Sequence, residues 1–381
     1  MRPRPERLER LPEQYFAALL ARVSAAAQEH GEPVVDLGRG NPDTAPAEAV
    51  IGRLVETACD LDQHGYAPFS GLPQLKQASA EGYDRLYGVS LDPETEVAVV
   101  PGTKSACAEL VLCLAHEGDE VLVPDPGYPD YASGIALAGA HRMPLPLDPL
   151  EGFRPAFDGL RPSSAAAVFL NYPSNPCAVV APPGVFAEAV AFAERTGAVL
   201  VHDFAYGDLV FDGRKPESVL ATPGARDVAV ELFTMSKSYG MAGWRLGFVV
   251  GNAEVVARLE ELQDHLRAGI FMPIQHAAIT ALRFAQEDVL ARRDLYEARR
   301  NRVLAALAGT RVAEPRCEGS YYVWLQLPDG VSAQSLLVEH RIALAPGEGF
   351  GMAGRGWARL SLSVPDERLD LGVARLREAF S

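Results

Sequence analysis

The sequence lacks the features that mark several classes of protein. Its 381 residues contain no apolar run approaching the roughly 20 residues that a membrane-spanning helix needs. Lysine and arginine number only 35 against 50 acidic residues, and the formal net charge is −15. Because the phosphates of nucleic acids bind to basic surfaces, this balance argues against a nucleic-acid partner. We therefore expect neither a membrane protein nor a nucleic-acid-binding protein.

Cysteine is also scarce. Cys59, Cys107, Cys113, Cys177 and Cys317 form no C-x-x-C pair and make an odd count. This pattern indicates neither a disulfide framework nor a structural zinc site. The first residues carry positive charge, but the apolar stretch of a secretory signal does not follow them. We expect a cytoplasmic protein with reduced thiols and no bound metal.

The arrangement of hydrophobic residues predicts an α/β fold. Hydrophobic residues make up 48% of the chain, and its length predicts about two domains. Between residues 96 and 252, six short runs rich in Val, Leu and Phe alternate with helical stretches, which is typical of a doubly wound α/β domain. The runs begin at residues 97, 120, 166, 198, 231 and 246.

The two ends of the chain have a different pattern. Residues 6–30 have the pattern of an amphipathic helical entry, and residues 253–308 that of long helices. Strand-like runs return in SYYVWLQL at 320 and WARLSLSV at 357, followed by a closing helix at 366–380. The tail and the first fifty residues together predict a second, smaller α+β domain.

Five of the six central runs end in a polar or Gly/Pro-rich turn. These turns read PGTKSA, DPGYPD, NYPSNP, DFAYGD and TMSKSYG. In doubly wound sheets, ligands bind outside the carboxyl ends of the strands. The five turns therefore predict where the chemistry takes place.

Lys237 directly follows an apolar run and has small neighbours. Desolvation there lowers the pKa of an amine and makes it competent to form an imine, although a lone lysine is usually a solvated surface residue. Arg245 can bind a phosphate through two parallel hydrogen bonds, and Thr234 adds a hydroxyl. The turn Gly102-Thr103-Lys104 opens a helical stretch, so its backbone N–H groups can complete a phosphate site.

Asp203 ends the run AVLVHD, and a carboxylate at the mouth of a buried strand needs a partner. A pyridinium nitrogen is such a partner, and its protonation makes the ring an electron sink. Asp203 can also be a helix N-cap or, with His202, part of a metal site, but the neighbouring turns offer no further ligand at suitable spacing. Tyr206 and Asn175 can hydrogen-bond a phenolate oxygen and Tyr128 can stack on a ring, or all three can serve packing and turn formation.

Four motifs occur together in an order typical of one enzyme family. They are N-Y-P-S-N-P at 171, H-D-F-A-Y-G-D at 202, T-M-S-K-S-Y-G-M-A-G-W-R-L-G at 234 and W-A-R-L-S-L-S at 357. With them, the chain resembles the fold-type I, class I/II pyridoxal-phosphate-dependent aminotransferases, and in particular the glutamate-pyruvate (alanine) branch. The resemblance implies a mixed, mostly parallel central sheet in a large cofactor-binding domain at 51–285. It also implies a smaller α+β domain that combines an N-terminal part at 1–50 with residues 286–381.

The resemblance also assigns roles to single residues. It implies that Lys237 is the Schiff-base lysine and proton carrier, that Asp203 pairs with the pyridine nitrogen, and that Tyr206 and Asn175 hold the ring oxygen. The other residues implied to contact the cofactor are Gly102, Thr103, Lys104, Tyr128, Thr234, Ser236, Arg245 and Tyr66. The residues implied to contact the substrate are Arg359, which clamps the α-carboxylate, and Gly40, Arg39, Asn175 and Tyr15.

The implied reaction is a transamination in two ping-pong half-reactions, with alanine, glutamate, pyruvate and 2-oxoglutarate as substrates. Tyr66 matches the tyrosine that reaches into the neighbouring subunit's phosphate site, which implies a homodimer with shared active sites. Thr103, Ser105, Cys177 and Arg39 depart from the pattern of the alanine branch. Arg39 concerns specificity, since it either turns to solvent or faces a distal carboxylate of the substrate.

Other functions are compatible with parts of the sequence. Residues 349–354 fit G-x-G-x-x-G, but that dinucleotide-binding fingerprint must open a helix and here precedes a strand-like run. A lyase or cyclising enzyme on the same scaffold would share the cofactor residues, as would an aminotransferase for aspartate, aromatic amino acids or diaminopimelate. A non-catalytic module is expected to lose Lys237 or Asp203, and both are present.

Overall fold

The large central sheet dominates the structure, a computed structural model that describes residues 3–30 and 33–381. Within these residues, the sheet has eight strands in the order β2-β9-β8-β7-β6-β3-β4-β5. Its strands are β2 (Val97–Val100), β3 (Glu120–Asp125), β4 (His141–Asp148), β5 (Arg154–Pro155), β6 (Ala165–Asn171), β7 (Val199–Asp203), β8 (Ala229–Thr234) and β9 (Gly247–Gly251). The six predicted runs are β2, β3 and β6 to β9.

The directions of the strands confirm a mixed, mostly parallel sheet. β4, β3, β6, β7 and β8 pair in parallel, and β5 is antiparallel to β4. β9 is antiparallel to both β8 and β2, so β2 again runs in the direction of β8. The carboxyl ends of β2, β3, β6, β7 and β8 therefore lie at one edge of the sheet. All five predicted turns follow at that edge.

The sequence-based prediction omitted β4, whose sequence is HRMPLPLD. Pro144 and Pro146 lack the backbone N–H that a strand donates, which disguises the strand. The strand tolerates them because the short β5 pairs only with Leu147 and Asp148, and the bond at Pro146 uses the proline carbonyl, which accepts from the Ala156 N–H at 2.9 Å.

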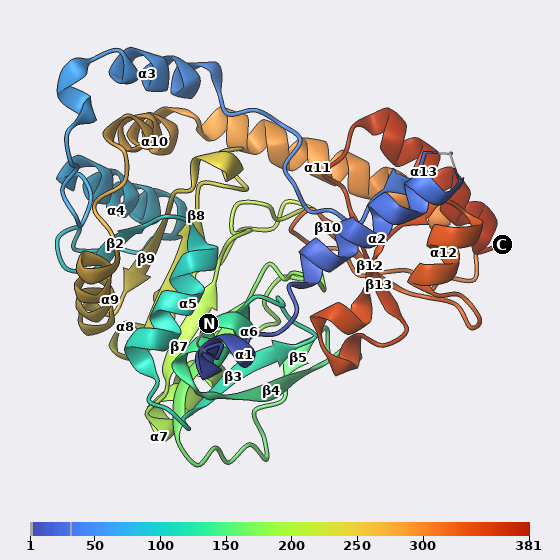
Figure 1. Cartoon of the computed structure of the whole chain (residues 1–381), viewed down its shortest axis with the longest axis horizontal. Helices are drawn as coiled ribbons and strands as arrows, with labels where there is room; N and C mark the ends of the chain where they lie inside the picture. Colours follow the sequence, from blue (N-terminus) through green and yellow to red (C-terminus); the bar gives the residue numbers. More distant parts are fainter. Residues whose placement is uncertain (1–2, 31–32) are drawn as a thin grey trace.

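Helices cover both faces of this sheet (Figure 1). Alternate residues of β2 point to opposite faces, so Ala98 and Val100 pack beneath α5 and α9 while Val97 and Val99 pack beneath α4 and α10. Burial on both faces explains why the strands are apolar throughout rather than alternating. The helices of this part are α4 (Pro73–Tyr87), α5 (Thr103–Leu114), α6 (Tyr131–Ala138), α7 (Val185–Thr196), α8 (Ala225–Val228), α9 (Ala253–Leu266) and α10 (Met272–Phe284), with the short turns η2 (Val219–Ala221) and η3 (Ala242–Trp244).

The two ends of the chain meet in a second group of elements, at the right of Figure 1. β1 (Val35–Asp36) pairs in parallel with β11 (Ile342–Ala343), and β13 (Trp357–Ser361) lies between β10 (Tyr322–Gln326) and β12 (Ala345–Pro346). This confirms a smaller α+β part built from both ends, while the domain boundaries at residues 50 and 285 stay a prediction. The helices of this group are α11 (Gln286–Leu307), α12 (Ala333–Glu339), η4 (Gly347–Phe350), η5 (Met352–Gly354) and α13 (Asp366–Ala379), whereas α3 (Glu48–Ala58) and η1 (Leu61–His64) pack on α10.

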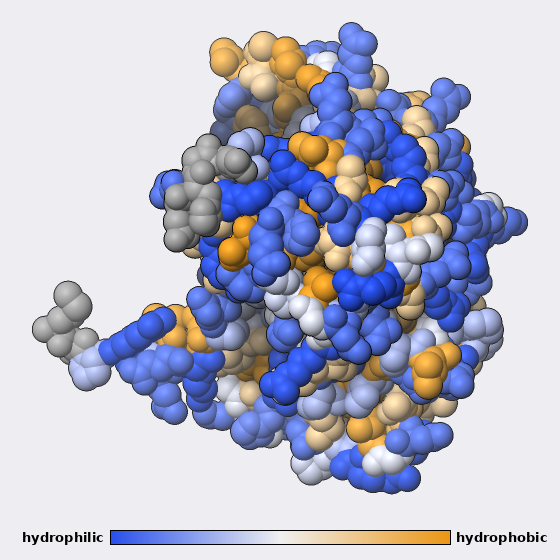
Figure 2. Space-filling view, turned by 90° about the vertical axis from the view of Figure 1, so that its right-hand side faces the viewer, coloured by the Kyte–Doolittle hydropathy of each residue, from blue (hydrophilic) through white to orange (hydrophobic). Residues whose placement is uncertain are grey.

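The predicted helical entry at 6–30 is interrupted. α1 (Glu6–Glu9) and α2 (Tyr15–His30) are separate, and Pro12 lies in the segment between them. α1 buries none of its residues, and Figure 2 shows this end of the chain standing off the body of the molecule. A proline has no N–H for the helical ladder, which explains the break.

Two further findings concern segments discussed in the sequence analysis. The glycine-rich stretch at 349–354 forms parts of η4 and η5 ahead of β13 and does not open a long helix, so it is not a dinucleotide-binding turn. Among the helices of the described residues, none combines the length and the apolar character needed to cross a membrane.

Candidate active site

A cavity of about 450 Å³ lies where the five turns meet. Its wall contains most of the predicted site residues, which come from both groups of elements. These are Arg39, Gly40, Thr103, Lys104, Tyr128, Asn175, Asp203, Tyr206, Thr234, Ser236, Lys237, Arg245 and Arg359.

Lys237 lies in the turn after β8, half-buried at the cavity wall. Its Nζ lies 5.8 Å from the ring centre of Tyr206 and 5.4 Å from that of Tyr321. Burial lowers the pKa of Lys237, and the positive charges of Arg359 and Arg245 lower it further. An amine in such surroundings gives up its proton more readily than a solvated lysine, which suits a nucleophile or a base.

Asp203 is the last residue of β7, and its carboxylate is buried at the cavity. Oδ2 accepts a hydrogen bond of 2.7 Å from the Tyr131 hydroxyl, and Oδ1 accepts one of 3.2 Å from the Ala205 N–H. Burial raises the pKa of Asp203. His202 instead lies 2.7 Å from Glu231 through its Nδ1, so it does not share a metal site with Asp203.

An anion site forms between the start of α5 and the turn before β9. Gly102 precedes α5 at φ 88°, and no side chain caps the free N–H groups of that helix. A Cβ at Gly102 would lie 2.3 Å from Nη2 of Arg245, so only glycine lets the guanidinium approach the helix start. Thr234 donates a hydrogen bond of 2.9 Å to the Ser236 hydroxyl, and both line the same cavity. N–H groups at a helix start, a guanidinium and hydroxyls are the donors that bind phosphate.

Arg359 on β13 is 1% exposed. Its Nη1 donates to Asn175 Oδ1 at 2.7 Å and its Nη2 to Gly38 O at 3.0 Å, while its buried Nε has no hydrogen-bond partner. The guanidinium carbon lies 3.9 Å from the ring centre of Tyr322. No carboxylate of the described residues pairs with Arg359. A buried guanidinium without an anion is costly, so this geometry favours an anionic ligand such as a carboxylate.

Tyr206 and Tyr322 form a pair beside Lys237. The Tyr206 hydroxyl donates to the Tyr322 oxygen at 3.2 Å. Burial raises the pKa of Tyr206, and Tyr322 raises it further. Burial also opposes ionisation of Tyr322, but the positive charges of Arg359 and Lys237 bring its pKa below the ordinary value. The pair therefore combines a hydrogen-bond donor, Tyr206, with an acceptor, Tyr322, whose pKa is lowered.

Lys104 and Tyr128 flank the anion site. Lys104 Nζ lies 2.9 Å from Asp130 Oδ2, and Asp130 Oδ1 accepts a hydrogen bond of 2.6 Å from Gln14. The charge of Lys104 is thus shared with Asp130, which also holds the start of α2 in place. The ring of Tyr128 packs 6.2 Å from that of Phe16, and both line the cavity.

Arg39 and Gly40 belong to the segment after β1, and they line the cavity together with the sheet turns. Arg39 is exposed at the rim. A Cβ at Gly40 would lie 2.0 Å from the Tyr322 hydroxyl, so the chain there passes too close to the ring for any side chain. Residues that line the cavity without having been predicted are Phe16, Leu19, Leu20, Asp36, Asn41, Cys107, Asn171, Ala205 and Tyr322. Of these, Asn171 carried a signal, because it begins the motif NYPSNP.

Three predicted residues are not among those that line the cavity: Gly102, Tyr15 and Tyr66. Gly102 lies beside it, directly before α5. Tyr15 donates to Pro346 O at 2.7 Å and lies in the wall of a neighbouring cavity, while Phe16 takes the position at the site. Tyr66 is 91% exposed. Within one chain, the structure therefore separates Tyr66 from the other predicted residues.

Comparisons with known proteins match this arrangement. The family model described as aminotransferase class I and II matches residues 32–376. An L-glutamine–4-(methylsulfanyl)-2-oxobutanoate aminotransferase of Bacillus subtilis is 42% identical over 97% of this chain and 94% of its own length. The glutamate-pyruvate aminotransferase AlaC of Escherichia coli is 37% identical over 99% of this chain and 95% of its own. The substrate-bound structure of BacF from Bacillus subtilis superposes with a TM-score of 0.92 at 36% identity, over 100% of this chain and 98% of the other.

The cofactor of this family suits the side chains of the cavity. Members use pyridoxal phosphate, which presents an aldehyde, a pyridine nitrogen and a phosphate. An amine of lowered pKa at Lys237, the carboxylate of Asp203 and the anion site at Gly102 and Arg245 are suitable partners for these three groups. The chain therefore belongs to the class I and II aminotransferases and is a pyridoxal-phosphate-dependent enzyme of fold type I.

Proposed function

We propose that this enzyme transfers the amino group between L-glutamate and 2-oxo acids, with alanine and pyruvate as the second substrate pair. The observation that supports this most is that the cavity holds two guanidinium groups, Arg39 and Arg359, besides Arg245 of the anion site. Arg359 is buried, has no anionic partner among the described residues, and donates a hydrogen bond to Gly38 O. Arg39 follows Gly38 in the sequence and lies at the rim of the same cavity. A dicarboxylic substrate has one carboxylate for each of Arg359 and Arg39.

Each predicted residue has a task in this proposal. When bound, pyridoxal phosphate supplies a ring that accepts electron density from the substrate Cα. Lys237 Nζ holds the cofactor and carries the proton that leaves Cα, for which its lowered pKa suits it. Asp203 pairs with the ring nitrogen, and Asn175 and Tyr206 bind the ring oxygen. Arg359 orients the α-carboxylate.

The phosphate belongs, in this proposal, at the start of α5. The uncapped N–H groups there and the guanidinium of Arg245 face the same space. Thr234 and Ser236 add hydroxyls, and the ammonium of Lys104, paired with Asp130, lies at the same cavity. The positive end of the helix dipole adds to the attraction.

A second candidate substrate has an apolar side chain. Phe16, Leu19 and Leu20 of α2 form an apolar part of the cavity wall, on which a methylsulfanyl group can pack. The Bacillus subtilis relative is named for 4-(methylsulfanyl)-2-oxobutanoate, which supports this candidate. Arg39 can turn to solvent when such a side chain binds, because its long stem is flexible.

We also propose that the enzyme is a homodimer. Leu61, Tyr66 and Phe69 are 86%, 91% and 53% exposed, and Leu266 and Phe271 are 58% and 42% exposed. The two segments touch, because a Cβ on Gly269 would lie 2.3 Å from Pro68 O. An exposed apolar group of this kind marks an interface. A second copy of the chain would cover it and bring Tyr66 to the partner's phosphate.

The substrate proposal is tested by single half-reactions. Purified enzyme is mixed with glutamate, glutamine, alanine or methionine, and the absorbance change of the cofactor is followed. Arg39→Met is expected to lower kcat/KM for glutamate at least about tenfold and to leave alanine within about threefold, because one carboxylate loses its partner. Parallel losses for both amino acids, or none for either, would show that Arg39 does not select the side chain.

A further inference from the structure

One face of α11 holds three buried side chains that reach the pocket-lining loop. Arg292, Tyr296 and Arg299 follow a spacing of four and three residues, which places them on one side of the helix. They are 6%, 0% and 5% exposed. Buried arginines are costly without partners, so their contacts need explanation.

Arg292 connects two segments that are far apart in the sequence. Nε donates to Thr44 Oγ1 at 2.6 Å and Nη2 to Ala45 O at 2.8 Å, while Nη1 donates to Ser238 O. A Cβ on Gly240 would lie 2.9 Å from both Arg292 Nη2 and Thr44 O, so the two segments and the guanidinium meet closely. All three nitrogens of one rigid planar group are thus engaged.

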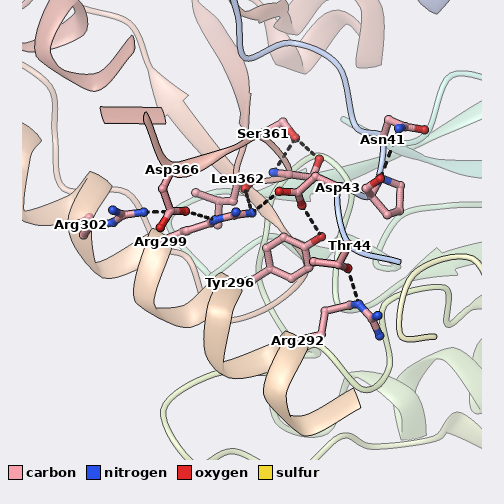
Figure 3. A network of polar contacts seen from close by, with 12 residues as sticks. Asn41, Asp43, Thr44, Arg292, Tyr296, Arg299, Arg302, Ser361, Leu362 and Asp366 are labelled. Carbon is pink, nitrogen blue, oxygen red and sulfur yellow. Dashed lines mark hydrogen bonds and ion pairs between the residues drawn. The ribbon is translucent and has the colours of Figure 1, made fainter. Parts of the chain in front are cut away.

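Tyr296 and Arg299 hold the same loop one step further along α11 (Figure 3). The Tyr296 hydroxyl donates to Asp43 Oδ1 at 3.2 Å, and Arg299 Nη1 donates to Asp43 Oδ2 at 2.8 Å. Arg299 also donates to Leu362 O at 3.0 Å and to Asp366 Oδ1 at 2.7 Å. Side chains of one helix therefore bind every residue of loop 43–45: Asp43 through Tyr296 and Arg299, and Thr44 and Ala45 through Arg292.

The segments joined by Arg292 continue directly into the two sides of the cavity. Loop 43–45 comes shortly after Arg39, Gly40 and Asn41, and these three residues line the cavity. Ser238 follows Lys237. The lysine turn has a second tie, since the Met241 N–H donates to Met235 O at 3.1 Å. Tyr296 and Arg299 hold the loop at Asp43, whereas Arg292 holds it at Thr44 and Ala45. Loss of Arg292 would therefore disturb residues 44 and 45 more than the lysine turn.

We propose that Arg292 is a positioning residue that fixes the substrate-side loop 39–45 against the turn of Lys237, with Tyr296 and Arg299 holding the loop to the same helix. The residue touches neither substrate nor cofactor and acts through the three oxygens that it bridges. This inference deepens the proposed function and rests on it for its kinetic test alone.

The test compares Arg292→Lys with wild type. A lysine keeps the charge but presents one compact ammonium, which cannot span three oxygens in a plane. We expect KM for glutamate to rise about tenfold and kcat to change by less than about threefold, because the loop moves while the lysine turn keeps its second tie. Hydrogen exchange of the backbone amides at 38–46 in the holoenzyme is expected to speed up about tenfold, with the central strands unchanged.

Two further variants keep the outcome decisive. Thr44→Val removes the acceptor of Arg292 Nε and should raise KM and loop exchange two- to threefold, even if Arg292→Lys does not fold. Arg293→Lys is the control, because it alters the neighbouring arginine, which pairs with Asp294. It should change neither KM nor the hydrogen exchange of the loop. Unchanged loop exchange in both Arg292→Lys and Thr44→Val would overturn the inference. So would a loss of activity that follows the folded fraction at constant KM.

The exchange measurement also separates this inference from the proposed function. It uses no substrate, so faster loop exchange supports the positioning role even if glutamate is a poor substrate. An enzyme that turns over no amino acid in the half-reactions contradicts the proposed function and leaves the exchange result standing.

Discussion

The replacement of Arg359 gives the most direct test of how this cavity binds its substrate. Arg359 Nη1 and Nη2 already donate to Asn175 and Gly38, and the buried Nε is free of partners. A substrate carboxylate in the same space completes the ion pair. In Arg359→Lys the charge remains, but a single ammonium replaces the planar fork, and the substrate loses at least one charged hydrogen bond.

The magnitude follows from these contacts. A hydrogen bond to a charged group contributes about 1.5–3 kcal/mol, and the reorientation of Asn175 adds to the loss. At about 1.4 kcal/mol per factor of ten, Arg359→Lys should lower kcat/KM about 30- to 100-fold. Arg359→Met leaves the substrate carboxylate buried and unpaired, which costs about 2–5 kcal/mol, and should therefore lower kcat/KM by a factor between about 30 and about 3,000.

The assay is the half-reaction with glutamate and with alanine, followed by the absorbance of the cofactor. Because every α-amino acid has the α-carboxylate, kcat/KM should fall equally for glutamate and alanine in the Arg359 variants. In Arg39→Met, by contrast, it should fall for glutamate alone. Arg355→Lys, at an exposed residue of the preceding segment, is the control and should have wild-type kinetics. A loss in Arg359→Met of less than about fivefold, or one confined to glutamate, would refute the reasoning.

Three further variants test the cofactor site and the assembly. Lys237→Ala should abolish both the visible absorption band and the borohydride-reducible bond to the protein, because both require this amine; a reducible bond that persists would contradict the assignment. Asp203→Asn should retain the fold and most cofactor while slowing Cα proton loss at least about 100-fold, as a barrier increase of about 3 kcal/mol predicts; a variant that keeps more than about a tenth of the wild-type rate would argue against the ring contact. Tyr66→Phe should weaken cofactor retention, and subunits of Tyr66→Phe mixed with subunits of Lys237→Ala should form heterodimers whose activity depends on which substitutions share a site. Equal activity in mixed and separate preparations would count against a shared site.

Patterns local in sequence accounted for most of the central sheet. β2, β3 and β6 to β9 are apolar runs without alternation, because strands buried on both faces need none, and all but β9 end in one of the five predicted turns. β4 escaped this pattern through Pro144 and Pro146, and the entry helix was broken at Pro12. Both errors concern proline, whose effect depends on neighbours that the sequence does not show.

The site residues also fall into two groups, those that local sequence patterns could place and those that depend on packing. Lys237, Asp203 and Thr103 stand next to the ends of strands, so the topology rule alone places them together. The sequence could not show that Tyr322 rather than its neighbour Tyr321, or Phe16 rather than its neighbour Tyr15, lines the cavity. Only the packing of β10 and α2 decides which of two adjacent side chains faces it. The contact of Arg359 with Asn175 spans 184 residues and likewise depends on how the two parts of the chain pack.

The sign of the cavity's charge opposes that of the chain, and this difference has a kinetic consequence. The net charge of −15 is spread over the whole molecule, whereas the cavity is lined by more basic than acidic side chains: Arg39, Lys104, Lys237, Arg245 and Arg359 against Asp36 and Asp203. Anionic substrates are thus repelled at long range and attracted at the mouth. Salt screens both effects over about 10 Å at 0.1 M and about 3 Å at 1 M, and leaves the contacts within the cavity less affected. If attraction at the mouth dominates, kcat/KM falls with ionic strength, and more steeply for 2-oxoglutarate than for pyruvate because of its second charge. We expect the steeper dependence for 2-oxoglutarate with salts of several different anions. An effect of one anion alone would instead indicate that this anion competes with the substrate for the site. An equal dependence for the two acids would show that the cavity's charge acts on bound substrate alone.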